Sequence, residues 1–208
     1  MSTIILDFGS GNTCKNDKDY IKVMYDQLKK VDSGKHNIIV KFQLFKFSGP
    51  NIPLKQEIFD YAFKYGLELG YKVTSSVFDM ASLDFLINRY GDKIPFIKIA
   101  NRRDLDWLMD YIPQSIDIII SKTESLFLPG IKNKIEEMWC ISQYPAKFES
   151  YEKLSIKKGD NISDHTEDFS LFEKYCPKIV EWHYKLDYST GLDSGSFART
   201  PQMLSEIL

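Results

Sequence analysis

Eight short runs of apolar and β-branched residues recur along the chain, and a polar or helix-like segment follows most of them. The runs cover residues 3–8, 37–42, 72–77, 96–99, 117–121, 138–142, 161–163 and 178–184. Three segments between them, residues 20–28, 54–66 and 83–90, place apolar side chains three and four positions apart, as an amphipathic helix does. A strand–helix pattern repeated in this way is typical of a parallel sheet.

The number of repeats favours a closed barrel over an open sheet. We therefore predict an α/β fold, a (β/α)8 TIM barrel formed as a single domain by residues 1–208. Such barrels usually take about 250 residues, so a chain of 208 residues is expected to have shortened helices. An open doubly wound sheet is the alternative, but Gly9 and Gly11 follow the first run without the third glycine of a dinucleotide-binding loop.

Charge and cysteine content exclude several classes of partner. The 27 basic and 29 acidic residues give a net charge of −2, so we expect no nucleic-acid partner. The three cysteines, Cys14, Cys140 and Cys176, form neither a Cys-x-x-Cys pair nor an even set for disulfides, which indicates a reducing cytoplasm. No apolar run reaches the length of a membrane span, so we expect a soluble protein without a membrane partner.

Polar side chains close the predicted strands. In a barrel of this kind the catalytic groups lie at the carboxyl ends of the strands, and residues two apart share a face. The strand-end residues are Asp7, Lys41, Gln43, Ser76, Lys98, Ser121, Ser142, Ser163, His165, Glu181 and His183. A serine there is often a structural hydrogen-bond partner. A buried ammonium group needs an anionic partner, so Lys41 and Lys98 predict a phosphate or carboxylate ligand.

Two of the three histidines, His165 and His183, end neighbouring predicted strands. Glu181 lies on the same face as His183, and Asp193 follows on the next loop. Two imidazoles with oxygen ligands suit Mn²⁺, Fe²⁺ or Zn²⁺. The spacing alone leaves two hypotheses open, because histidines and carboxylates also form ordinary hydrogen bonds.

Several segments, in order along residues 7–208, resemble motifs of the N-acetylneuraminate (sialic acid) synthase family. Residues 40–43 contain its Val-Lys-Phe-Gln motif, and residues 140–146 match its Cys-x-Ser-x-Tyr-Pro-Ala motif. Residues 162–166 contain its Ser-Asp-His-Thr signature. Weaker matches lie at residues 74–78, 96–100, 180–184, 191–193 and 197–201.

This resemblance implies a role for each matching residue. His165 and His183 are expected to hold a divalent metal, usually Mn²⁺. Phosphoenolpyruvate is expected among Lys41, Ser76, Lys98, Ser121, Ser142 and Ser163. The acceptor sugar is expected to face Asp7, Tyr144 and Asp193, with Glu181 beside both metal and acceptor. The catalytic candidates are Asp7, Lys41, Lys98 and Glu181, and the substrate-binding candidates also include Gln43 and Asn101.

The implied reaction is an aldol-like condensation of phosphoenolpyruvate with the aldehyde of an N-acylated amino sugar. It yields a nonulosonic (sialic-type) acid and phosphate, with no covalent attachment to the protein. Two alternatives stay open. In the first, the chain is a related phosphoenolpyruvate-condensing enzyme whose acceptor is a phosphorylated aldose. In the second, it is a non-catalytic relative that binds a metal or a sugar.

Departures from the family pattern concern the acceptor. Asp7 stands where the family has glutamate, and residues 101–103, Asn-Arg-Arg, stand where it usually has Ser-Gly-Glu. The family's C-terminal antifreeze-like domain, which supplies an arginine to a partner subunit's site, has no counterpart in this sequence. Arg102 or Arg103, a homodimer, or a separate partner that supplies this domain are the candidates to replace it.

Overall fold

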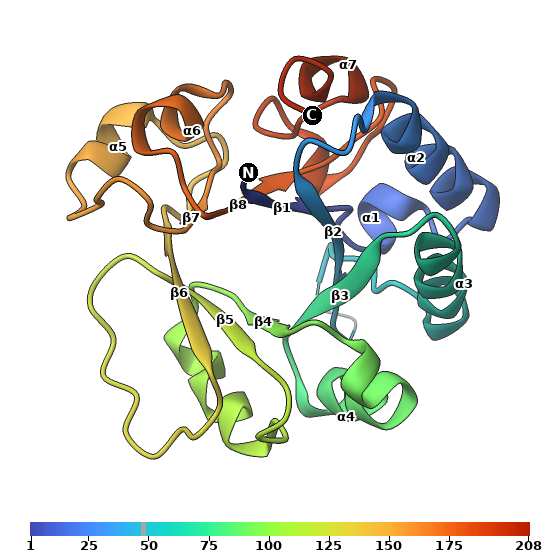
Figure 1. Ribbon diagram of the computed structural model, residues 1–208. Helices are drawn as coiled ribbons and strands as arrows, with labels where there is room; N and C mark the ends of the chain where they lie inside the picture. The colour runs from blue at the N-terminus through green and yellow to red at the C-terminus, as the bar shows by residue number, and fades with distance from the viewer. Residues whose placement is uncertain (47–48) are drawn as a thin grey trace.

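The computed structural model describes residues 1–46 and 49–208, which form a closed barrel of parallel strands (Figure 1). The strands are β1 (Thr3–Asp7), β2 (Asn37–Leu44), β3 (Lys72–Val77), β4 (Ile97–Ile99), β5 (Ile118–Lys122), β6 (Ile135–Cys140), β7 (Ile162–Ser163) and β8 (Ile179–His183). Each strand pairs with the next, and β8 closes on β1, where His183 lies opposite Asp7. The predicted α/β barrel is confirmed, and the open sheet is excluded.

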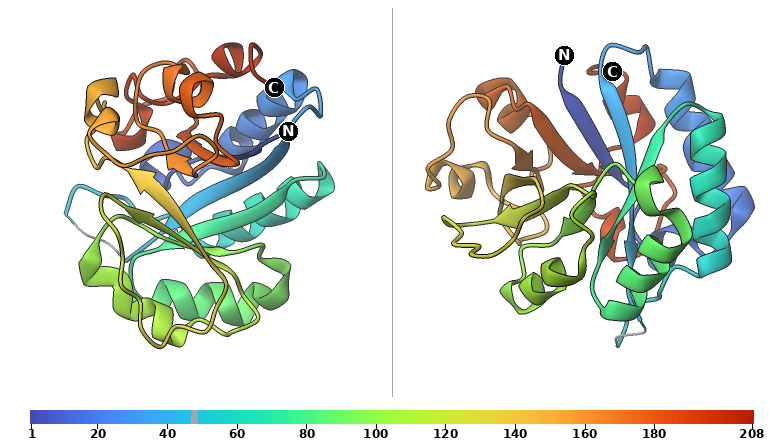
Figure 2. Two further views of the ribbon diagram at one scale, coloured as in Figure 1. Left: turned by 60° about the vertical axis from the view of Figure 1, so that its left-hand side comes forward. Right: turned by 60° about the horizontal axis from the view of Figure 1, so that its bottom comes forward.

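The helices outside the barrel are uneven in length. They are α1 (Gly11–Cys14), α2 (Lys18–Val31), α3 (Gln56–Glu68), α4 (Met80–Tyr90), α5 (Phe148–Glu152), α6 (Ser170–Tyr175) and α7 (Pro201–Leu204). Short 3₁₀ helices cover Gly91–Lys93, Arg103–Tyr111 and Leu192–Ser194. The three predicted helices are confirmed: residues 20–28 and 83–90 lie within α2 and α4, and the predicted helix at 54–66 corresponds to α3, which begins two residues later. Helices α3 and α4 pack against β3, and α2 packs against α3 (Figure 2).

Carboxylates at their N-caps fix where two of the long helices begin. Asp17 accepts hydrogen bonds from the backbone N–H of Asp19 (2.8 Å) and Tyr20 (3.4 Å) at the start of α2. Asp79 does the same for Ser82 (2.8 Å) at the start of α4. Such caps satisfy N–H groups that have no partner within the helix.

The strands divide their side chains between two cores. At the amino end of the barrel a plug of apolar residues fills the interior: Ile5, Ile39, Phe96, Ile119 and Met138. The alternate side chains of the same strands face outward and pack under the helices, as the two-residue period of a strand requires. Because the plug closes one end, the polar residues further along the strands line a cavity at the other end.

The barrel differs from the sequence prediction around β6. We predicted a strand over residues 138–142, but the strand covers Ile135–Cys140, so Ser142 lies beyond its end. The charged Glu137 is tolerated because it faces outward and pairs with Lys122 of β5. Residues 123–134, between β5 and β6, form a loop instead of a helix, and its apolar residues Leu126, Leu128 and Ile131 pack against the outer core.

Shortened helices were expected and are confirmed by α5, with 5 residues, and α6, with 6 residues. Among the helices in the described ranges, none combines the length and the apolar character that crossing a bilayer requires.

Candidate active site

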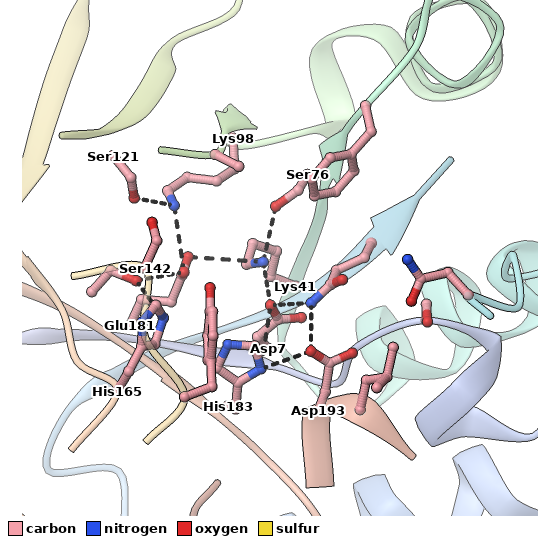
Figure 3. A pocket seen from close by; sticks show the side chains of 18 of the residues that line it. Asp7, Lys41, Ser76, Lys98, Ser121, Ser142, His165, Glu181, His183 and Asp193 are labelled. Atoms are coloured by element: carbon pink, nitrogen blue, oxygen red, sulfur yellow. Dashed lines mark hydrogen bonds and ion pairs between the residues drawn. The ribbon is translucent and has the colours of Figure 1, made fainter. Parts of the chain in front are cut away.

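A cavity of about 1200 Å³ opens where the strands end, and every strand contributes a side chain to its wall (Figure 3). All the predicted site residues lie on this wall: Asp7, Lys41, Gln43, Ser76, Lys98, Asn101, Ser121, Ser142, Tyr144, Ser163, His165, Glu181, His183 and Asp193. The structure therefore brings together residues that are up to 186 positions apart, Asp7 and Asp193. Their roles remain predictions.

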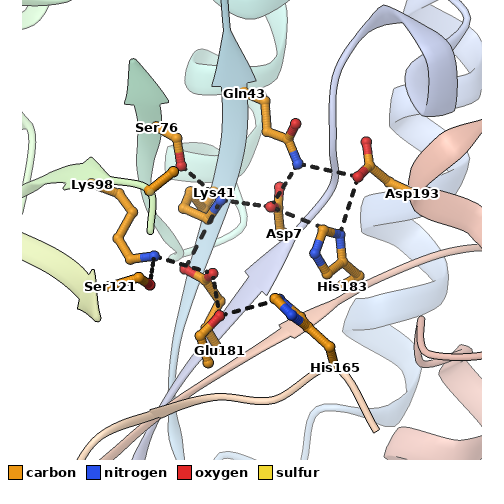
Figure 4. Close-up of polar contacts among 12 residues, drawn as sticks. Asp7, Lys41, Gln43, Ser76, Lys98, Ser121, His165, Glu181, His183 and Asp193 are labelled. Atoms are coloured by element: carbon orange, nitrogen blue, oxygen red, sulfur yellow. Dashed lines mark hydrogen bonds and ion pairs between the residues drawn. The ribbon is translucent and has the colours of Figure 1, made fainter. Parts of the chain in front are cut away.

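The floor of the cavity is a layer of buried charges. Lys41 Nζ lies 2.6 Å from Asp7 Oδ2 and donates to Ser76 Oγ at 2.9 Å. Lys98 Nζ donates to Ser121 Oγ at 2.7 Å. Glu181 lies between the two ammonium groups, with 3.4 Å from its Oε1 to Lys98 Nζ and 3.9 Å from its Oε2 to Lys41 Nζ (Figure 4).

These charges keep one another ionised. Burial alone would raise the pKa of Asp7, but the ammonium of Lys41, the nearby His183 and the hydrogen bonds from Lys41 and Gln43 lower it to about 2. Burial also opposes ionisation of Glu181, yet Lys41 and Lys98 lower its pKa below the ordinary value. Likewise Asp7 and Glu181 overcome the effect of burial and raise the pKa of Lys41. Two ammonium groups thus face two carboxylates.

The two predicted imidazoles converge above this layer, with 5.3 Å between their ring centroids. His165 Nδ1 lies 2.7 Å from the carbonyl oxygen of Ile141, so this nitrogen carries the proton, and the lone pair of Nε2 faces the hydroxyl of Ser163 at 3.4 Å. Burial, followed by the neighbouring His183, lowers the pKa of His165 to about 3, which keeps the ring neutral at pH 7. Among residues 1–46 and 49–208, the buried His183 Nδ1 has no hydrogen-bond partner, and it lies 3.5 Å from Asp193 Oδ1 and 3.9 Å from Asp7 Oδ2.

These residues fit a divalent metal held by two imidazoles. A neutral ring whose second nitrogen is fixed by a backbone carbonyl is typical of a metal-ligating histidine, and His165 has this arrangement. Buried Nδ1 of His183 and Oε2 of Glu181 have no hydrogen-bond partner in the described part of the chain, which is unusual for buried polar atoms. No group of three or more potential ligands among His, Cys, Asp and Glu is poised for a metal within the described ranges. Substrate and water would therefore complete the coordination.

Amide and hydroxyl groups join the loops at the rim of the cavity. Gln43 Nε2 donates to Asp7 Oδ2 at 2.9 Å and lies 3.4 Å from Asp193 Oδ1. Asn101 Nδ2 donates to Ser142 Oγ at 3.0 Å. These contacts link the end of β2 to the loop after β8, and the end of β4 to the segment after β6.

An aromatic wall encloses the imidazoles on the outer side. The ring of Tyr144 lies 4.2 Å from that of His165, and the ring of Phe197 lies 5.0 Å from that of His183. Our sequence reasoning gave Phe197 no role, although its position close after Asp193 was a signal. It also gave none to Cys140, which strand alternation places on the same face as Ser142.

The two arginines after β4 have different surroundings. Arg102 lines the cavity mouth and pairs with Asp104 at 2.5 Å. Arg103 is not among the cavity-lining residues, and its guanidinium donates to the backbone carbonyl of Ser121 at 2.7 Å. Of the two, only Arg102 is therefore placed to meet a ligand.

The remaining histidine, His36, has a structural role, in the turn between α2 and β2. Its Nδ1 accepts a hydrogen bond from the backbone N–H of Ser2 at 3.2 Å. It does not line the cavity.

No protein-family model and no curated protein matches the chain, but solved structures do. An N-acetylneuraminic acid (sialic acid) synthetase from Leptospira borgpetersenii serovar Hardjo-bovis, in complex with citrate, is 18% identical with a TM-score of 0.70, over 98% of this chain and 80% of that one. A putative spore coat polysaccharide biosynthesis protein E from Chromobacterium violaceum is 16% identical with a TM-score of 0.75, over 99% and 72%.

A third similar structure is a truncated 3-deoxy-D-arabino-heptulosonate 7-phosphate synthase from Thermotoga maritima. It is 10% identical with a TM-score of 0.64, over 99% of this chain and 83% of that one. Over nearly its whole length the chain thus has the barrel fold of a sialic acid synthetase, a spore coat polysaccharide biosynthesis protein and a heptulosonate phosphate synthase.

Proposed function

We propose that this protein condenses phosphoenolpyruvate with the aldehyde of an N-acylated amino sugar and releases phosphate and a nonulosonic acid. The observation that carries the proposal is the arrangement of one cavity: two buried ammonium groups, Lys41 and Lys98, on its floor, and two imidazoles, His165 and His183, above them. The motif resemblance and the fold shared with sugar-acid synthases support the same chemistry.

In the proposed reaction the methylene carbon of phosphoenolpyruvate forms a bond to the aldehyde carbon, whose oxygen takes up a proton. Water adds to the second carbon of phosphoenolpyruvate, and phosphate leaves as the C–O bond breaks. The products are a 2-keto-3-deoxy sugar acid and inorganic phosphate. Holding two substrates in register is the main demand on the protein.

The side chains divide this work. Lys41 and Lys98 are placed to meet the carboxylate and phosphate charges of phosphoenolpyruvate. Glu181 is ionised, and its Oε2, which accepts no hydrogen bond within the described residues, accepts the proton of the adding water. Asp7 and Asp193, linked by Gln43, are placed to orient the acceptor.

A divalent metal such as Mn²⁺, when bound by His165 and His183, supplies Lewis-acid polarisation of the aldehyde. The neutral ring of His165, fixed by a backbone carbonyl, and the His183 Nδ1 that has no hydrogen-bond partner among the described residues support this assignment.

A second candidate acceptor is a phosphorylated aldose. It is favoured by two cations at the cavity mouth, Arg102 and Lys46, which could receive a second anionic group. Acceptor recognition by a homodimer partner or by a separate protein also stays a prediction. Light scattering, which measures the mass of the protein in solution, checks whether the homodimer forms.

One assay separates these possibilities. The protein is incubated with Mn²⁺, phosphoenolpyruvate and a panel of N-acylhexosamines and phosphorylated aldoses, and phosphate release is followed. Release that requires metal and an N-acylated sugar supports the first proposal, and release only with phosphorylated aldoses supports the second. No release across the panel, with metal still bound, identifies a non-catalytic relative.

A further inference from the structure

The fully buried guanidinium of Arg199 lies behind the cavity and joins two loops that form its wall. Arg199 follows β8 and is 0% exposed. Its Nη1 donates to the carbonyl oxygens of Thr166 at 2.7 Å and Phe197 at 2.8 Å. Its Nη2 donates to Asp164 Oδ2 at 3.3 Å and to the carbonyl oxygen of Asp168. One side chain thus holds the loop after β7 against the segment that carries Phe197.

Asp164 completes this buried cluster. It too is 0% exposed, and its Oδ1 accepts hydrogen bonds from the backbone and the hydroxyl of Thr166, at 2.8 and 2.7 Å. Its Oδ2 accepts from Trp182 Nε1 at 2.9 Å. The guanidinium carbon of Arg199 lies 5.1 Å from the ring centroid of Phe169 and 5.8 Å from that of Trp182. Such further bonds stabilise a buried ion pair, and of the side-chain nitrogens and oxygens of this one only Arg199 Nε has no hydrogen-bond partner within the described residues.

Arg199 contacts residues that adjoin both imidazoles. Asp164 and Thr166, which it binds, are the two chain neighbours of His165. The backbone carbonyl of Phe197, which it also binds, belongs to the residue whose ring packs on His183. Neither Arg199 nor Asp164 lines the cavity, so neither can touch a ligand there.

We infer that Arg199 is a positioning residue that sets the distance between the His165 loop and the aromatic wall, and so sets the geometry of the imidazole pair. The effect on metal and turnover rests on the proposed function, whereas the coupling of the two loops does not. Arginine is required because its planar fork donates in several directions at once. A lysine at this position keeps the charge but cannot span the same acceptors.

The test uses three variants and one control. Arg199→Lys keeps the charge, Arg199→Met removes it, and Asp164→Asn combined with Arg199→Met removes both buried charges. The control is Arg89→Met, because Arg89 also makes a two-bonded pair, with Asp60, but is exposed and does not line the cavity. Each protein is measured for thermal unfolding, for hydrogen exchange by mass spectrometry, and for Mn²⁺ affinity by electron paramagnetic resonance.

In Arg199→Lys we expect the peptides covering residues 164–169 and 192–199 to exchange about tenfold faster together, while the rest of the barrel keeps its protection. Mn²⁺ affinity should fall by about tenfold, the low end of the range for residues that orient metal ligands. In turnover, kcat should fall while the KM for phosphoenolpyruvate changes little. Arg89→Met should match the wild type in all of these.

The double variant separates positioning from charge neutralisation. If Arg199 positions the loops, this variant regains thermal stability relative to Arg199→Met but keeps the fast exchange and the weak Mn²⁺ binding. Recovery of slow exchange in both segments would overturn the inference, as would normal protection of both loops in Arg199→Lys. If the wild type binds no Mn²⁺ and turns over no substrate, the proposed function fails, and the exchange data still decide whether Arg199 couples the loops.

Discussion

The carboxylate of Glu181 faces the ammonium group of Lys98 at 3.4 Å through one oxygen, while its other oxygen has no hydrogen-bond partner in the part of the chain that the structure describes. Glu181 thus forms a looser ion pair than Asp7 does, because Lys41 Nζ and Asp7 Oδ2 lie 2.6 Å apart whereas Lys41 Nζ and Glu181 Oε2 lie 3.9 Å apart. Glu181 therefore holds a charge in the place where an anionic substrate is expected to meet Lys98, and we expect it to compete with that substrate.

Replacing this charge should strengthen substrate binding and weaken catalysis. In Glu181→Gln we expect phosphoenolpyruvate to bind about tenfold more tightly, about 1.4 kcal/mol, because a negative charge beside Lys98 is removed. Turnover should fall by about 100-fold, since an amide cannot accept a proton from water. Calorimetric titration with phosphoenolpyruvate and phosphate-release kinetics check the two effects. Glu137→Gln, on the outer face of β6, is the control. Weaker binding in Glu181→Gln would contradict the competition.

The two lysines of β4 and β5 offer a matched pair for the anion site. Lys98 lines the cavity, whereas Lys122 is on the outer face, paired with Glu137 and lying over the ring of Trp139. Lys98→Met should weaken phosphoenolpyruvate binding by about 100-fold, since hydrogen bonds to charged groups are worth about 1.5–3 kcal/mol. Lys122→Met should bind as the wild type does. An equal loss of phosphoenolpyruvate affinity in the two variants would show that only the net charge of the protein affects binding.

Metal removal should abolish turnover reversibly. A chelator is expected to stop phosphate release, and added Mn²⁺ is expected to restore it, because two imidazoles leave the metal exchangeable. His165→Ala and His183→Ala should each lose Mn²⁺ binding, measured by electron paramagnetic resonance. His36→Ala, which removes a ring that bonds to the backbone of Ser2, should keep it. Full turnover in the presence of the chelator would show that the reaction does not require a metal.

Asp7 should make the fold sensitive to acid. Its pKa is about 2 in the folded protein, below the value of about 3.9 in an unfolded chain. Its stabilisation is therefore present above pH 4 and is lost as the pH falls toward 2, by on the order of 2 kcal/mol. Urea unfolding of the metal-free protein between pH 2.5 and 6 measures this loss. Asp7→Asn should flatten the profile, and Asp117→Asn, at a surface ion pair, should not. An unchanged profile in Asp7→Asn would contradict the pKa shift.

The sequence predicts the barrel and its polar mouth well, because both depend on local periodicity. Runs of β-branched residues locate the strands, and the two-residue alternation shows which side chains share the cavity face. The positions of His165, Glu181 and His183 follow from this rule once β7 and β8 are located.

What the sequence could not predict depends on contacts distant along the chain. The start of β6 was missed because Glu136 and Glu137 make the segment look like a loop, whereas its backbone pairs with β5 from Ile135 onward and Glu137 pairs with Lys122. The buried position of Arg199 was missed for a similar reason. Its partners lie 31 to 35 residues earlier, with only Phe197 nearby, so no local pattern marks it as buried.

The most direct test of the account follows an isotope through the reaction. Phosphoenolpyruvate labelled with ¹⁸O in the oxygen that bridges carbon and phosphorus is incubated with the protein, Mn²⁺ and an N-acylated amino sugar. Phosphate release should require both metal and sugar. The label should be found in phosphate by ³¹P NMR, because the C–O bond breaks. Label retained in the keto acid, or no release with any aldehyde, would contradict it.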